Sequence, residues 1–314
     1  MSTLKRVLAL TLVAGVASAA AFAASGGYGA WSTAVRVESL PGTHPAFNGA
    51  FLDGCPFISR DGKTFYMARG PQYGGSGGID IWVSTRASAD APWGAPANVG
   101  PPVNSSANDF CPTISRDGHL FYFVSNRGGG CGGDDIYTTR LRPDGWDPVA
   151  NLGCATDGGP NSAGNEASPF PLPESGAGPV LYLSSTRAGT MDLYRTESHG
   201  GAFGLAEAIA ELNTSFADGH PNVRRDGLEI FFFSNRTGAQ GNDIYSATRA
   251  STSHPWSTPV NLGSNVNSPA AETRPSLSWD GTTLYFGSTR TGGDAEGDSD
   301  HYVTTRDKIT RSDR

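Results

Sequence analysis

Positive charge and long apolar runs are both scarce in this chain of 314 residues. Lys and Arg total 23 against 30 Asp and Glu, which gives a net charge of −7. A nucleic-acid interface needs clustered Lys and Arg to neutralise phosphates, so no nucleic-acid partner is expected. Residues 7–20 form the one long apolar run, and residues 205–212 form a weak apolar stretch. Helical periodicity is otherwise lacking, which favours an all-β chain.

Several catalytic signatures are lacking as well. The sequence has no G-x-S-x-G nucleophile elbow, no metalloprotease helix motif and no phosphate-binding loop. No cofactor is therefore predicted. These absences leave sugar hydrolysis open, because that reaction needs only two carboxylates.

The N-terminus is predicted to be a signal peptide, residues 1–23. Lys5 and Arg6 form a basic start, an apolar run follows, and Ala21-Phe22-Ala23 offers a small-x-small cleavage pattern. Cleavage after Ala19 is the alternative. The mature protein is therefore expected in the periplasm or the extracellular medium, with no membrane span after the signal is removed.

Glycine and proline are plentiful, with 42 and 21 residues, and they punctuate an internal repeat. Each of five units has an asparagine, an acidic residue five positions later and a proline three positions after that. The asparagines are Asn48, Asn104, Asn161, Asn213 and Asn267. The acids are Asp53, Asp109, Glu166, Asp218 and Glu272, and the prolines are Pro56, Pro112, Pro169, Pro221 and Pro275. By subtraction, successive asparagines lie 56, 57, 52 and 54 residues apart. A period near fifty with several short strands per unit indicates a β-propeller.

Four strands are predicted in each unit. Strand a follows the proline, and an Asp-Gly turn such as Asp117-Gly118 leads to an aromatic strand b, as in LFYFVS. Strand c begins at DIY or a variant of it. Strand d is expected to begin at an aromatic residue and to include the weak apolar stretch 205–212. Those aromatic residues are Trp93, Trp146, Phe203 and Trp256.

The two ends of the repeat predict how the ring closes. The fifth unit stops after strand c, and a copy of strand d lies at the N-terminus, in WSTAVRVES from Trp31. We therefore expect a five-bladed propeller over residues 31–306, whose N-terminal strand completes the last blade. Residues 24–30 are a short linker and residues 307–314 a C-terminal tail.

This repeat resembles the TolB-type, WD-repeat-like propeller repeat of bacterial exported proteins. The resemblance rests on N-x(4)-[DE]-x-x-P, x-D-G, [YF]-F-x-S-x-R and D-I-Y. It implies a β-propeller that serves as a binding scaffold, and it is not specific to one activity.

Charged residues recur on one predicted face of the ring. The repeated acids precede strand a, arginines end strand b and aspartates start strand c. The arginines are Arg69, Arg127, Arg187, Arg236 and Arg290, and the aspartates are Asp80, Asp135, Asp192, Asp243 and Asp300. An arginine and a strand-c aspartate flank the same loop, so a structural pairing is expected, either within that loop or across to the neighbouring blade.

The acids before strand a are predicted to ring the channel mouth, which makes them candidate ligand-binding residues. The residues directly before each proline are not repeated, so His220 and Arg274 are candidates for specificity, although an exposed loop histidine is the simpler interpretation of His220. A cation within the ring stays an alternative, as does calcium in the acidic loop Gly293–Asp300, which lacks the full EF-hand frame.

Four cysteines suit an oxidising compartment. Cys131 and Cys154 lie in two loops of one face of the second unit, so a Cys131–Cys154 disulfide is the favoured pairing. Cys55 and Cys111 precede the prolines of adjacent units, and a Cys55–Cys111 bridge is the weaker companion.

Because the acids and arginines belong to the repeat, the sequence favours a non-enzymatic scaffold that binds a protein or cell-envelope glycan as a monomer. The alternative is a carbohydrate-active enzyme that uses the channel-mouth carboxylates.

Overall fold

The computed structural model describes residues 27–173, 178–291 and 299–309. The predicted signal peptide and most of the acidic loop Gly293–Asp300 lie outside these residues. The described chain is built of strands, with three one-turn 3-10 segments at Val37–Ser39, Pro71–Tyr73 and Ala155–Asp157. No described helix is long and apolar enough to cross a membrane. The all-β prediction is confirmed.

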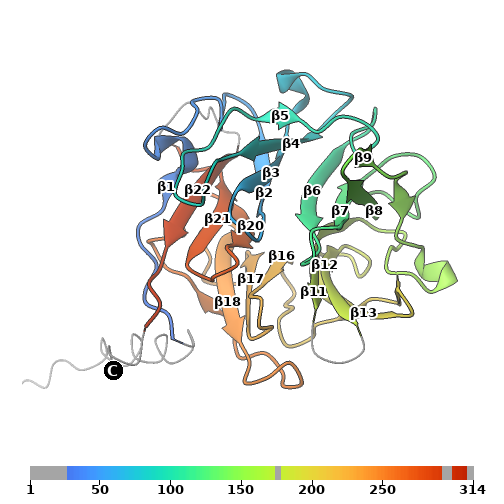
Figure 1. Ribbon diagram of the computed structural model, residues 1–314. Coiled ribbons are helices and arrows are strands. Elements are labelled where there is room, and N and C mark those ends of the chain that lie inside the picture. The colour runs from blue at the N-terminus through green and yellow to red at the C-terminus, as the bar shows by residue number, and fades with distance from the viewer. Residues whose placement is uncertain (1–26, 174–177, 292–298, 310–314) are drawn as a thin grey trace, which may run out of the picture.

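Five antiparallel sheets surround a central axis as the blades of a propeller (Figure 1). Blade 1 contains β2 (Asp53–Ile58), β3 (Thr64–Arg69), β4 (Asp80–Thr85) and β5 (Ala97–Asn98). Blade 2 contains β6 (Asp109–Ile114), β7 (Leu120–Ser125), β8 (Asp135–Arg142), β9 (Gly145–Trp146) and β10 (Ala150–Asn151). Blade 3 contains β11 (Glu166–Pro173), β12 (Pro179–Ser185), β13 (Asp192–His199), β14 (Ala202–Phe203) and β15 (Glu207–Ala208). Blade 4 contains β16 (Asp218–Val223), β17 (Glu229–Ser234), β18 (Asp243–Thr248) and β19 (Val260–Asn261). Blade 5 contains β20 (Glu272–Leu277), β21 (Thr283–Ser288), β22 (Asp300–Thr305) and the N-terminal β1 (Val35–Arg36).

The N-terminal strand closes the ring, as predicted. β1 pairs antiparallel with β22, with Val35 opposite Val303 and Arg36 opposite Tyr302. Trp31, just before β1, is buried against Phe231 of blade 4, with 6.0 Å between the ring centroids. The ring is therefore closed by backbone pairing and by an aromatic contact with the neighbouring blade.

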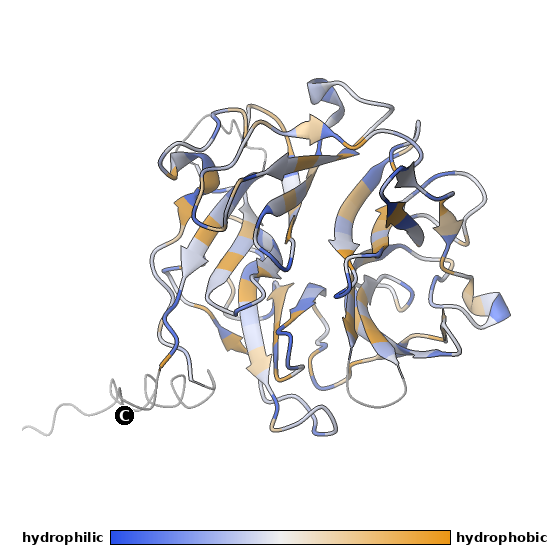
Figure 2. Cartoon of the chain, viewed as in Figure 1, coloured by the Kyte–Doolittle hydropathy of each residue, from blue (hydrophilic) through white to orange (hydrophobic). Residues whose placement is uncertain are grey.

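The aromatic strands b form the interior of the blades. Phe121, Phe123, Phe231, Phe232 and Phe286 are fully buried. Figure 2 shows the hydrophobic segments concentrated in the strands. Burying aromatic side chains of this size is the main favourable contribution to folding.

The outer strands are shorter than predicted. Strand d pairs with strand c over two residues in blades 1, 4 and 5 and over two separate two-residue segments in blades 2 and 3, and Trp93 and Trp256 precede it outside any strand. Both tryptophans are buried between blades, and the guanidinium groups of Arg86 and Arg249 lie 4.1 and 4.2 Å from their ring centroids. Packing of the indole rings therefore takes precedence over extension of the strand.

The innermost strands carry a β-bulge at the residue before each repeated proline. There the pairing register shifts in all five blades. The residues concerned have φ between 47° and 55°, a left-handed conformation that is uncommon outside glycine. They are Cys55, Cys111, Ser168, His220 and Arg274. The bulges bring these five residues to the axis, where all of them line a narrow channel.

Two disulfides are present, and both predicted pairings are confirmed. Cys131–Cys154 joins two loops of blade 2, and Cys55–Cys111 joins the bulges of blades 1 and 2, with Cα–Cα distances of 5.4 and 4.7 Å. The bulge brings the inner strands of adjacent blades close enough for the second bridge.

Candidate functional site

The repeated acids lie at the start of the innermost strands, but they are buried rather than arranged around an open channel mouth. All five have no exposed surface. Each forms an ion pair with the arginine at the end of strand b in its own blade. The pairs are Asp53–Arg69, Asp109–Arg127, Glu166–Arg187, Asp218–Arg236 and Glu272–Arg290. The sequence had suggested that the arginines pair with the strand-c aspartates. That expectation is wrong, because the arginines pair with the acids that precede strand a.

The same carboxylates also accept hydrogen bonds from the loop that precedes them. In blade 4, the backbone N–H and the hydroxyl of Thr214 both donate to Asp218 Oδ2 at 2.7 Å. Serines do this in blades 2, 3 and 5. In blade 1, Gly49 has no hydroxyl, and the phenol of Tyr73 donates to Asp53 at 2.7 Å instead. Buried carboxylates with this many donors are anchors of the blade.

Arg69 occupies a different register from the other arginines. It lies within β3 opposite Asp53, where the other blades have a serine, and its Nε donates to Asp53 at 2.6 Å. Arg127 lies two residues beyond the serine of its blade and reaches Asp109 through Nη2. The arginine of this ion pair can therefore stand at either of two backbone positions, opposite the acid or two residues further along the chain.

The repeated asparagines join neighbouring elements through the backbone. Asn104 donates to the carbonyl of Ile81 and accepts from its N–H, both at 2.9 Å. The other four asparagines make the same two contacts with the second residue of a strand c. Each side chain thereby acts as a short extra piece of β-ladder.

The strand-c aspartates have partners of their own. Asn98 and Asn261 of strand d donate to Asp80 and Asp243, at 3.0 and 2.7 Å. Asn151 donates to Asp135 in the same way at 3.2 Å, and Arg36 of β1 donates to Asp300 at 2.7 Å. No hydrogen bond to the Asp192 side chain is seen within the described part of the chain, because alanine replaces the asparagine in β15. Burial raises the pKa of Asp192 and that of Asp300, the latter to about 6.

The axial channel is narrow and holds no carboxylate among its described lining residues. Its volume is about 30 Å³, space for one or two waters. His220 is a buried strand residue that packs on Phe233 at 4.8 Å between ring centroids, so its interpretation as an exposed loop histidine is wrong. Burial, with a contribution from Arg274, holds the pKa of His220 well below its usual value, so the ring is neutral. Burial also lowers the pKa of Arg274, to about 10.

The channel widens into a cavity of about 510 Å³ on the opposite face, where strands a and b are joined. Phe57 and Phe170 line both spaces, so the two are continuous along the axis. A volume of this size is typical of small-molecule sites. The a–b turns therefore surround a concave site of small-molecule size on the axis.

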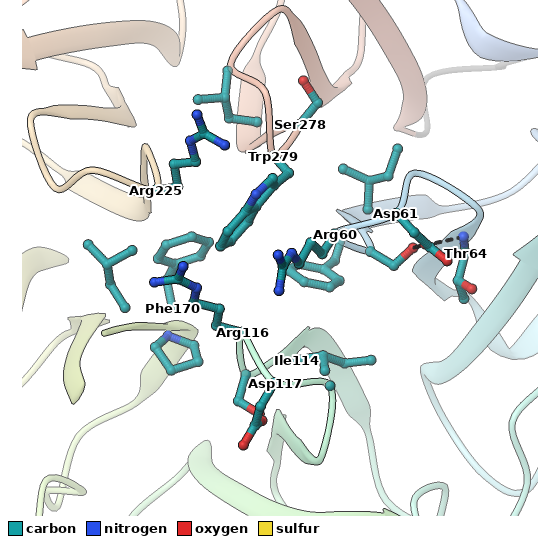
Figure 3. Close-up of a pocket in the computed structure, with 18 of the residues that line it drawn as sticks. Arg60, Asp61, Thr64, Ile114, Arg116, Asp117, Phe170, Arg225, Ser278 and Trp279 are labelled. Atoms are coloured by element: carbon teal, nitrogen blue, oxygen red, sulfur yellow. Dashed lines mark hydrogen bonds between the residues drawn. The ribbon is translucent and has the colours of Figure 1, made fainter. Parts of the chain in front are cut away.

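Three arginines and one tryptophan define the mouth of this cavity. They occupy the same place in their turns, directly before the Asp-Gly pair. The guanidinium carbons of Arg60, Arg116 and Arg225 lie 5.0, 5.3 and 6.0 Å from the ring centroid of Trp279. Figure 3 shows the three groups gathered around the indole. These distances to one centroid keep any two of the guanidinium carbons within about 11 Å of each other, so each pair repels by at least about 0.4 kcal/mol in water.

Two carboxylates lie at the rim of the cavity, on adjacent blades. Ser59 Oγ donates to Asp61 Oδ1 at 2.6 Å and Ser115 Oγ donates to Asp117 Oδ1. These hydroxyl hydrogen bonds are the largest cause that lowers the pKa of each carboxyl below its usual value. In Figure 3 both carboxylates are turned away from the three guanidinium groups.

Sequence reasoning missed this cavity because it assigned the x-Asp-Gly segments to hairpin turns alone. A usable signal was present: the residue before Asp-Gly is Arg, Arg, Arg and Trp in four of the five units. Turn geometry alone does not require such large side chains there. The ligand-binding role assigned to the buried acids, His220 and Arg274 stays a prediction.

Comparisons with known proteins agree on the fold. No model of a known protein family matches the sequence, and no curated protein matches it. Among solved structures, the catalytic domain of a GH62 α-L-arabinofuranosidase from Coprinopsis cinerea aligns with a TM-score of 0.56 and 15% identity, over 89% of this chain and 98% of that one. An endo-arabinase from Bacteroides thetaiotaomicron aligns with a TM-score of 0.53 and 16% identity, over 89% and 99%. A structure provisionally described as TolB, from Agrobacterium tumefaciens, has 16% identity, covers 90% of this chain and 100% of its own, and reaches a TM-score of 0.48, too low to support an argument.

The comparisons correct one expectation from the sequence. The structures with scores above 0.5 include arabinofuranosidases and arabinanases, so the expectation of a non-enzymatic scaffold is overturned. The expectation was wrong because the repetition of the acids in every blade was taken as evidence that the whole molecule is a non-enzymatic scaffold. The repeated acids are buried in ion pairs within their blades, and the cavity lies elsewhere. At these identities the similarity establishes the fold, a five-bladed propeller.

Proposed function

We propose that the protein is a carbohydrate-active enzyme that hydrolyses glycosidic bonds, with the cavity on the a–b turn face as its substrate site. The observation that carries the proposal is the composition of this cavity. It combines an aromatic platform, Trp279, with apolar walls and two oriented carboxylates, Asp61 and Asp117. The fold is shared with an arabinofuranosidase and an endo-arabinase, which supports a polysaccharide substrate.

Glycoside hydrolysis needs one carboxyl group as an acid and a second as a base or nucleophile. In Asp61 and Asp117, Oδ1 is held by a serine hydroxyl and by a backbone N–H at 3.0 and 3.1 Å. No partner is seen for either Oδ2 within the described ranges, so one oriented oxygen per carboxylate is available to a substrate. The scissile bond would lie at the rim, between blades 1 and 2.

The lowered pKa values set the pH dependence of this mechanism. Both carboxylates are ionised near neutral pH, which suits the base or nucleophile but not the acid. A bound sugar that covers one carboxyl would raise its pKa by desolvation. Activity is therefore expected to be highest at acidic pH, where the acid partner is protonated.

The compartment and repeat type also belong to this proposal. The predicted signal peptide and the two disulfides support an exported enzyme that meets polysaccharide outside the cytoplasm. The TolB-type resemblance is kept as a statement about the repeat and adds no Tol-related activity. The predicted monomeric state is retained.

The test is product analysis after incubation with debranched arabinan, polygalacturonate and xylan. The wild type is expected to release oligosaccharides from at least one of them, and Asp61→Asn and Asp117→Asn are expected to lose most of that activity. Asp280→Asn is the matched control, because Asp280 has the same turn position but does not line the cavity. If no substrate is cleaved, or if the Asp61→Asn/Asp117→Asn double variant is as active as the wild type, the proposal is wrong.

A further inference from the structure

The mouth of the cavity carries three guanidinium groups that form no ion pair with any described carboxylate. Arg60, Arg116 and Arg225 are exposed, and none forms an ion pair or side-chain hydrogen bond with another described residue. Several other arginines do form ion pairs with carboxylates. Arg224, directly beside Arg225, binds Glu229 at 2.6 Å and Asp226 at 2.9 Å.

The three arginines converge on one point although they come from three blades. Each guanidinium lies within 6.0 Å of the same indole centroid. A cation–π attraction to Trp279 favours this position for each group without using its hydrogen-bond donors. The donors therefore stay available to an incoming anion.

The surroundings of this cluster favour a sugar rather than a free inorganic anion. Trp279 is half-buried and presents a flat ring, and Phe57 and Phe170 supply apolar surface deeper in the cavity. A volume of about 510 Å³ is far larger than one small anion requires. An acidic sugar has both an apolar ring face and a charged group.

We propose that the cavity binds an acidic oligosaccharide, with a carboxylate or sulfate of one sugar unit held by Arg60, Arg116 and Arg225 and the ring of that unit lying on Trp279. This inference rests on the proposed function and specifies its substrate class. The planar guanidinium groups match the paired oxygens of a carboxylate or sulfate. The charged unit lies at the centre of the cavity, and the glycosidic bond to the next unit extends towards Asp61 and Asp117 at the rim.

Binding by titration calorimetry tests the proposal separately from turnover. The probes are trigalacturonate, a sulfated disaccharide and neutral arabinotriose, each titrated into the wild-type protein at low and high salt. The acidic probes are expected to bind at least about tenfold more tightly than arabinotriose at low salt, and to lose that advantage as salt screens the charges.

Substitutions identify the site. Arg60→Gln, Arg116→Gln and Arg225→Gln are each expected to weaken binding of the acidic probe about 2- to 10-fold. The triple variant is expected to bind acidic and neutral probes equally. Arg140→Gln is the control, because Arg140 is exposed on β8 and does not line the cavity. Trp279→Ala is expected to weaken both kinds of probe.

The outcomes separate this inference from the proposed function. Arginine-dependent binding of an acidic probe without turnover supports the inference and counts against the enzyme. Hydrolysis of a neutral arabinan that is unaffected by the triple variant supports the enzyme and overturns the inference. Equal affinity of the wild type for acidic and neutral probes also overturns it.

Discussion

Replacing Asp218 with asparagine tests whether the repeated acid–arginine pairs hold the blades together. Arg236 Nη2 lies 2.6 Å from Asp218 Oδ1, and both donors of Thr214 reach Oδ2 at 2.7 Å. Asparagine keeps the size of the side chain but removes the charge and turns an NH₂ group towards a donor. Asp218 is fully buried, so the polar groups left unmatched cannot be hydrated without local opening.

The expected loss of stability depends on the hydrogen bonds that Arg236 keeps in the variant. Breaking a buried ion pair by removing one partner typically costs about 3–5 kcal/mol. Arg236 is 15% exposed and still donates to the carbonyl of Leu212 and the hydroxyl of Ser234, each at 2.8 Å. The lower end of the range, about 3 kcal/mol, is therefore expected. For a domain of this size it corresponds to a fall in Tm of roughly 6–12 °C.

The assay is urea-induced unfolding at pH 7, with Asp192→Asn as the matched control. Asp192 starts strand c of the adjacent blade, and its carboxylate has no hydrogen-bond partner within the described part of the chain. Burial disfavours its charged form, so Asp192→Asn is expected to change stability by less than about 1 kcal/mol or to increase it. A loss below about 1 kcal/mol for Asp218→Asn, or equal losses for the two variants, would refute the architectural role of the pair.

Three further predictions concern stability. Burial raises the pKa of Asp300 from 3.8 to about 6, so the native state binds this proton more tightly than the unfolded state, and stability is lost as pH rises from 3.8 to about 6. Relative to Asp300→Asn, the wild type should gain about 1–2 kcal/mol between pH 7 and pH 4 after allowance for solvent screening, and a constant difference would contradict this. Deleting residues 24–40 removes β1 and the buried Trp31 and Val37, so the whole domain should lose at least about 5 kcal/mol, whereas unchanged thermal unfolding would contradict closure by β1. Cys131→Ser with Cys154→Ser should cost about 3 kcal/mol, measured by urea unfolding without reductant; a double variant as stable as the wild type would show that the bridge is dispensable.

The repeat made the fold predictable because each blade needs the same contacts. Asn104 and its four counterparts supply the same two backbone hydrogen bonds, so their spacing marked every blade. Partner choice was harder to predict. Arg127 is close in sequence to Asp135, yet strand pairing places Asp109 beside it, and no local pattern distinguishes the two acids.

The cavity was not predicted because it arises from convergence of separate turns. Arg60, Arg116 and Trp279 lie in three different blades, and the sequence of one turn does not show which other turns it meets. Closing the ring brings their side chains to one point on the axis. The blade motifs can be recognised one unit at a time. The candidate site cannot, because it depends on how the tertiary structure brings side chains of several units together.

A crystal structure of the wild-type protein soaked with trigalacturonate tests the central claim most directly, since that claim is the location of the glycan site. Density for a sugar unit is expected over Trp279, with its carboxylate within hydrogen-bond distance of at least two of Arg60, Arg116 and Arg225. Sugar bound instead on the face of the buried acids, or density absent from the cavity at concentrations that saturate binding in solution, would contradict it.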